Sequence, residues 1–103
     1  MNTMLLTNFY IAEAARWYRL AADQGYGPAK YALGEMYAEG RGVRKDYVLA
    51  HMWLNLAAAQ SYPLSTNLKV FYESKRAMVE GQMNPEQIAK AQRLAQTWKP
   101  KSK

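Results

Sequence analysis

A stretch of fourteen residues occurs twice in this chain, and an internal repeat constrains the fold more than any other sequence feature. Glu13–Tyr26 and Leu49–Tyr62 are offset by 36 residues and agree at seven of fourteen positions. The matched residues are Ala14 with Ala50, Trp17 with Trp53, Leu20 with Leu56, Ala21 with Ala57, Ala22 with Ala58, Gln24 with Gln60 and Tyr26 with Tyr62. A period of this size is typical of solenoids built from helix pairs.

The apolar residues of each copy recur with the spacing of an α-helix. The stripes, at i, i+3 and i+7, are Ala14, Trp17 and Ala21 in the first copy and Ala50, Trp53 and Ala57 in the second. Alanines let a neighbouring helix come close, while the indole fills the space beside it. The pattern predicts two equivalent helices, each packed against a neighbour.

A further helix is predicted between the copies, over Pro28–Glu39. Pro28 suits the first helical position, where its missing N–H costs nothing. The apolar face comprises Ala29, Leu33, Met36 and Tyr37. Gly34 in mid-helix costs about 1 kcal/mol relative to alanine, and close approach of another helix would explain that cost. Gly40-Arg41-Gly42-Val43 should then end the helix, because glycine accepts positive φ there, and Asp46 should cap the next one.

These residues together resemble one complete repeat of the Sel1-like family, which is related to the tetratricopeptide repeats. The signature positions are Ala29, Leu33, Gly34, Tyr37, Gly40, Gly42, Val43, Asp46, Ala50, Trp53, Ala57 and Ala58. The resemblance implies an all-α solenoid of antiparallel helix pairs, with about five helices in this chain. Pro28–Glu39 would be the first helix of a pair and Asp46–Gln60 the second.

The rest of the chain departs from a full repeat, and we expect a single domain over residues 1–98. Residues 11–25 resemble only a second helix, residues 28–61 form the complete repeat, and residues 63–98 form a degenerate capping pair. In that pair the apolar residues of Pro63–Val79 suit an amphipathic helix, with Leu64, Leu68, Phe71, Tyr72, Met78 and Val79 on its face. Asn84-Pro85-Glu86-Gln87 is a strong helix start, and a buried stripe of Ile88, Ala91, Leu94, Ala95 and Trp98 follows it. Residues 99–103 form a basic tail.

The lone second helix at the beginning should leave Trp17, Leu20 and Ala21 without a neighbour. Three outcomes are open. Met1–Phe9 folds back as a cover, two chains pair through their open ends, or the chain is a fragment of a longer array. We favour a homodimer through the open N-terminal face, because a large exposed apolar patch is unusual on a stable monomer.

Little in the sequence indicates catalysis, a metal or a cofactor. The chain has no cysteine and one histidine, His51, which we interpret as a surface or rim residue. Ser61, Ser65 and Thr66 lack a nucleophile-elbow pattern and are interpreted as helix-entry residues. Glu35 and Glu39 share a helix face, which is interpreted as a solvated charged surface. The glycine-rich loop lacks the spacing of a phosphate-binding loop.

Partner binding is therefore the first functional hypothesis. In the family that the chain resembles, first helices line a concave surface, which implies these contact residues: Lys30, Tyr31, Glu35, Glu39, Lys69, Tyr72 and Arg76. A non-enzymatic interaction module in a bacterial cytoplasm is expected, with a protein or peptide partner. No run reaches the ~18 apolar residues of a membrane helix, and Met1–Leu6 is interpreted as the start of the mature chain.

The net charge of +6 leaves an alternative open. Basic residues cluster in the loop and in the tail, at Arg41, Arg44, Lys45, Lys99, Lys101 and Lys103. Such clusters could attract nucleic acid or an anionic surface. We expect solubility to be their main role.

Overall fold

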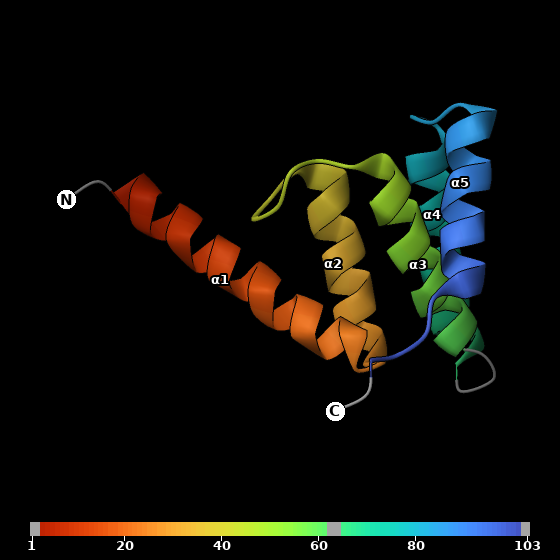
Figure 1. Cartoon of the computed structure of the whole chain (residues 1–103), viewed down its shortest axis with the longest axis horizontal. Coiled ribbons are helices and arrows are strands. Elements are labelled where there is room, and N and C mark those ends of the chain that lie inside the picture. Colours follow the sequence, from red (N-terminus) through yellow and green to blue (C-terminus); the bar gives the residue numbers. More distant parts are fainter. Residues whose placement is uncertain (1–2, 62–64, 102–103) are drawn as a thin grey trace.

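The structure, a computed structural model, describes residues 3–61 and 65–101 and is all-α, as predicted. Its five helices are α1 (Thr3–Asp23), α2 (Gly27–Glu39), α3 (Tyr47–Ser61), α4 (Thr66–Glu80) and α5 (Pro85–Thr97). There is no β-strand among these described residues. The helices follow one another from α1 at one end of the molecule to α4 and α5 at the other, so they form a short stack (Figure 1). Both α4 and α5 pack on α3 and make little contact with each other.

Local sequence signals set where several helices begin. The Asp46 carboxylate accepts from the backbone N–H of Leu49 at 3.0 Å, as its predicted capping role requires. Asn84 and Gln87 form the predicted capping box, each side chain accepting from the other's backbone N–H at 2.8 and 2.9 Å. Ser65 caps α4 in the same way through Leu68. These bonds satisfy N–H groups that a helix start leaves without partners.

Helix α3 lies at the centre of the stack and packs against α2, α4 and α5. Trp53 is 2% exposed, and it packs with Ala22, Ala29 and Leu33, which come from α1 and α2. Its ring also meets Trp98, just after α5, edge-on at 5.9 Å between centroids. One indole therefore joins four of the five helices into a common core.

Close approach of α2 and α3 explains the glycine in mid-helix. A Cβ at position 34 would lie 2.8 Å from Cγ of Leu54 and 3.3 Å from the carbonyl oxygen of Ala50. Leu54 is fully buried, so it has no free space to move into. The expected close contact at Gly34 is thus confirmed.

The loop after α2 uses two glycines for different reasons. Gly40 has φ 68° and ends α2 in the left-handed conformation, as expected. Gly42 has φ 75°, and a Cβ there would lie 2.7 Å from the carbonyl oxygen of Ile11 in α1. The loop is therefore both the turn of one pair and a contact surface for the helix before it.

Helix α1 is longer than the sequence indicated. Of the three open outcomes, a fold-back of Met1–Phe9 does not occur in the described residues, because Thr3–Phe9 continues the same helix. Its N-terminal end projects away from the other four helices (Figure 1). As a result Trp17 is 63% exposed and Leu20 is 53% exposed, as expected for a helix without a cover.

The last pair also differs in part from expectation. Residues 63 and 64 of the predicted helix lie outside the described residues, and α4 starts at Thr66. Tyr72 and Val79 are buried, but Leu68, Phe71 and Met78 of the predicted apolar face are 39%, 45% and 68% exposed. They remain exposed because, among the described helices, only α3 packs closely on α4.

Candidate partner-binding groove

The first helices of the two pairs, α2 and α4, bring side chains together along one side of the molecule. We call this surface the α2–α4 groove and define it by Tyr31, Glu35 and Glu39 of α2 with Phe71, Tyr72, Lys75 and Met78 of α4. At one end of it is an open pocket of about 220 Å³, lined by Glu35, Ala38, Glu39, Tyr47, Lys75, Met78, Val79 and Gln82. The α4 members Phe71, Lys75 and Met78 lie at i, i+4 and i+7, so they share a helix face.

Aromatic rings form the middle of the groove. Tyr31 stacks on Tyr72 with 4.9 Å between centroids and contacts Phe71 at 5.5 Å. Tyr72 is only 5% exposed and anchors the cluster, while Phe71 remains half exposed. Burial and the nearby Glu35 carboxylate raise the pKa of Tyr31 to about 12, so its hydroxyl stays protonated at neutral pH.

The charge in the pocket is opposite in sign to that of the whole chain. Lys75 lies 3.8 Å from the carboxylate of Glu35, whereas Glu39 is exposed on the next turn. Two carboxylates and one ammonium therefore surround the pocket, in a chain whose net charge is +6. A cationic side chain beside the exposed methyl group of Met78 would suit this arrangement.

The opposite end of the groove is apolar. A second open pocket, of about 210 Å³, is lined among the described residues by Tyr26, Gly27, Pro28, Ala57, Gln60, Ser61, Leu68 and Tyr72. Tyr72 is common to this pocket and to the aromatic cluster, which makes the two continuous. Along its length the groove therefore has an apolar end, aromatic rings in the middle and an acidic end.

The predicted contact residues do not all meet in this groove. Tyr31, Glu35, Glu39 and Tyr72 do, but Lys30 is 5% exposed and its ammonium lies 4.2 Å from the centre of the Trp98 ring. Desolvation lowers the pKa of Lys30. The Trp98 ring, just after α5, lies over this side chain, a contact that the spacing within α2 does not reveal.

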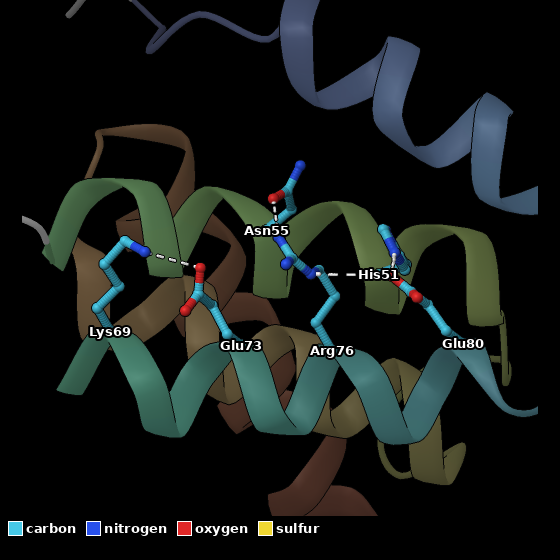
Figure 2. A network of polar contacts seen from close by, with 6 residues as sticks. All are labelled: His51, Asn55, Lys69, Glu73, Arg76 and Glu80. Carbon is cyan, nitrogen blue, oxygen red and sulfur yellow. Dashed lines mark hydrogen bonds and ion pairs between the residues drawn. The ribbon is translucent and has the colours of Figure 1, made fainter. Parts of the chain in front are cut away.

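Lys69 and Arg76 project from the other side of α4, toward α3 (Figure 2). Lys69 pairs with Glu73 at 2.8 Å. Arg76 donates to the side-chain oxygen of Asn55 and lies 3.8 Å from Glu80. Arg76 therefore belongs to a polar network between α3 and α4, whereas the Lys69–Glu73 pair lies along α4.

The same network overturns the interpretation of His51 as a surface residue. His51 is 1% exposed, and its Nε2 lies 2.7 Å from a carboxylate oxygen of Glu80 (Figure 2). Its buried Nδ1 has no hydrogen-bond partner among the residues that the structure describes. The described residues contain no group of three or more His, Cys, Asp or Glu side chains that could hold a metal ion.

The basic loop and the basic tail lie apart. Arg41, Arg44 and Lys45 follow the C-terminal end of α2 and are exposed, beside an open hollow of about 510 Å³ between the loop and α1. Lys101 lies at the other end of α2, where its backbone N–H donates to the carbonyl of Asp23 at 2.7 Å. Since α2 has 13 residues, roughly 20 Å of helix separates the clusters.

Several groove residues were missed by the sequence prediction. Lys75, Met78 and Phe71 line the groove but were assigned no binding role. Their spacing in the sequence places them on one face of α4, and this could have identified them as candidate binding residues. Tyr47, at the start of α3, was missed because only the folded structure brings it to the pocket between α2 and α4.

An antiparallel pair, α2 and α3, with α1 packed on α2 and with α4 and α5 packed on α3, is the arrangement of an α/α repeat protein. Comparison with known families gives the particular class: the Sel1 repeat matches residues 11–26 and 27–62, half of the chain. The chain belongs to the Sel1 repeat family, whose members are generally protein–protein interaction modules.

Two relatives show the extent of the likeness. Chitin synthase regulatory factor 3 of Schizosaccharomyces pombe is 43% identical over 51 residues, which is 50% of this chain and 6% of that protein. Alginate biosynthesis protein AlgK of Azotobacter vinelandii is 42% identical over 48 residues, 47% of this chain and 10% of that protein. This chain therefore corresponds to a small part of either relative, and no solved structure matches it.

Within residues 3–61 and 65–101, no helix combines the length and apolar character needed to cross a membrane.

Proposed function

We propose that this chain is a non-enzymatic binding module whose α2–α4 groove holds a segment of a protein partner. The observation that carries the proposal is the juxtaposition of Tyr31, Phe71 and Tyr72 between an apolar pocket and an acidic pocket. Aromatic side chains contribute most of the binding energy at many interfaces, because they bury a large area at a small entropic cost. Membership of the Sel1 repeat family supports the same role.

The groove also indicates the character of the segment. Helix α2 has 13 residues, so the groove is roughly 20 Å long, enough for about three turns of a helix or about six residues of extended peptide. An apolar residue would enter the pocket near Pro28, and a lysine or arginine would lie near Glu39. Because the groove is short, we expect micromolar affinity unless the partner binds elsewhere as well.

Peptide selection tests this proposal directly. A library of random peptides displayed on phage is selected on the immobilised chain, and enriched peptides are titrated by calorimetry. We expect enriched peptides to combine large apolar residues with a basic one. Their affinity should fall about tenfold or more in a Glu39→Lys, Met78→Glu double variant.

A variant of similar charge change provides the control. Glu86→Lys with Gln92→Glu alters exposed residues of α5, away from the groove, with the same change in net charge, and should leave the affinity unchanged. Peptides that bind the groove variant as tightly as the unmodified chain would contradict the proposal. So would a library from which no peptide is enriched.

The exposed basic loop supports a second candidate, binding of nucleic acid or an anionic surface. Its test is the anisotropy of a fluorescent DNA duplex at low and moderate salt, since phosphate contacts make binding steeply salt-dependent. Because the basic loop and the basic tail lie at opposite ends of α2, they do not form one continuous charged surface, and this favours the groove as the principal site.

We also infer a cytoplasmic location, in a bacterium. The cysteine-free sequence supports the cytoplasmic location.

A further inference from the structure

Helix α1 carries an apolar stripe on the side that faces away from α2. Ala15 and Ala22, which face the other helices, are 4% and 0% exposed. The residues on the opposite side are exposed by 39–65%: Leu6, Phe9, Tyr10, Trp17 and Leu20. With 3.6 residues per turn, Leu6 and Trp17 lie within roughly 20° of the direction opposite Ala15. The stripe therefore runs along most of the helix.

The spacing of this stripe indicates what would cover it. Leu6, Tyr10, Glu13, Trp17 and Leu20 follow one another at alternating gaps of four and three residues. That 3.5-residue period keeps one seam facing a second helix along its whole length, as in a coiled coil. A helix with the same period is the best complement, and α1 of a second copy has it.

We propose that two copies of this chain associate through α1, with the helices antiparallel and Glu13 of each near a two-fold axis. Five half-exposed large side chains contribute roughly 100 Å² each, so pairing would bury on the order of 1,000 Å² in total. This area reaches the lower limit of specific interfaces. The surface is independent of the α2–α4 groove, which stays open in such a dimer.

Charge and side-chain size favour the antiparallel arrangement. In a parallel pair, Arg16 would lie beside Arg16 of the second copy. In an antiparallel pair centred on residue 13, it lies beside Tyr10 of the second copy, where cation and ring attract each other. Leu6 then meets Leu20, and Phe9 meets Trp17. Glu13 already lies 3.7 Å from Arg16 of its own helix, which balances the two carboxylates near the axis.

The other end of the stack does not offer a matching surface. The outward residues of α5 are polar and exposed: Glu86, Gln87, Lys90, Gln92, Arg93 and Gln96. Stacking α5 of one copy on α1 of the next would desolvate these charges against Trp17 and Leu20. A closed pair through α1 avoids this cost.

Sedimentation of the purified chain gives the first test. We expect a dimer at high micromolar concentration, and a dissociation constant about tenfold higher or more for Trp17→Glu or Leu20→Glu. Both residues are exposed, so circular dichroism should show unchanged helix content. Met78→Glu, at a 68% exposed site on α4, is the matched control and should remain a dimer. A monomeric unmodified chain overturns the proposal.

Engineered cysteines test the direction, because the chain has none of its own. Under mild oxidation Glu13→Cys should form a disulfide-linked dimer by itself. Leu6→Cys and Leu20→Cys should each remain unlinked alone but link when mixed. Linking of Leu6→Cys with itself would show a parallel pair, and linking of Leu6→Cys with Met78→Cys would place α1 in the groove of the other copy. Either result overturns the proposed dimer.

Discussion

Neighbouring residues on one helix of this molecule differ widely in what their side chains contact. Lys30 and Tyr31 are neighbours on α2, yet the first packs under Trp98 and the second faces α4. Gly34, about one turn further along α2, has no room for a Cβ atom because the side chain of Leu54 lies too close. The side chains available for binding are those that the second helices and α5 leave uncovered.

Gly34→Ala should destabilise the chain by about 1–3 kcal/mol through overpacking against Leu54, although alanine favours a helix by about 1 kcal/mol. Urea denaturation checks this result. Gly27→Ala is the control, because its Cβ would meet only the side chain of Gln60, at 3.5 Å. Equal effects of the two substitutions would show that helix propensity, and not the contact with Leu54, decides the outcome.

Tyr31 should make stability fall at high pH. Its pKa is raised from 10.0 to about 12 in the folded chain, so the folded state favours the neutral phenol. That contribution is complete below pH 10 and is lost as the pH rises from 10 to 12. Tyr31→Phe should therefore show a shallower loss of the free energy of unfolding over this interval, measured by urea denaturation. An unchanged slope would contradict the assignment.

Residue-level prediction succeeded where the cause was local and failed where it was distant. Asp46 and Asn84 were recognisable as caps, because their partners lie three residues away. Gly34 was recognisable because a mid-helix glycine requires a compensating contact. The burial of His51 depends on Glu80, 29 residues away, and that of Lys30 on Trp98. No periodicity within one helix carries this information.

At the scale of elements, the two sequence copies have become helices with different surroundings. Helix α3 has neighbours on several sides, whereas α1 packs mainly against α2. The same tryptophan position is consequently buried in one copy and exposed in the other. The repeat predicted both helices but not the extension of α1 to Thr3, since Met4–Tyr10 lies before the repeated segment and has no match in the second copy.

The two tryptophans give a matched pair of substitutions. Trp53→Ala should lower the free energy of unfolding by about 3–5 kcal/mol, because it empties the centre of the core. Trp17→Ala should change it by about 0.5 kcal/mol or less at low protein concentration, where the chain is monomeric. Denaturant titrations of both variants at one dilute concentration make the comparison. Similar losses would mean that α1 packs in a way that the structure does not show.

Over the whole molecule, neighbour-to-neighbour packing makes stability uneven along the stack. A solenoid gains its stability from contacts between adjacent repeats, so an end with few neighbours opens most easily. The N-terminal half of α1 has all its residues from Thr3 to Tyr10 exposed. At the other end, α5 is held to α3 through Leu94, Ala95 and Trp98, which pack against the core cluster of Met52 and Trp53. The architecture was predictable from the period, but this asymmetry depends on which contacts form.

Hydrogen exchange should reveal the asymmetry directly. In dilute solution, amides of Thr7–Tyr10 should exchange at least about 100-fold faster than those of Leu54–Ala58, because opening the end of α1 breaks few tertiary contacts. Mass spectrometry of peptic fragments measures both segments in one experiment. Equal protection would indicate that the helices open together as one unit.

The contact between Gly42 and Ile11 fixes the angle at which one pair follows another. Because the loop backbone lies directly against a carbonyl of α1, any side chain at this position would act as a wedge between them. Such a side chain would push α1 away from the loop and rotate it about the turn at Gln24–Tyr26. In a long array with the same substitution in every repeat, small rotations would accumulate and alter the pitch and curvature of the superhelix.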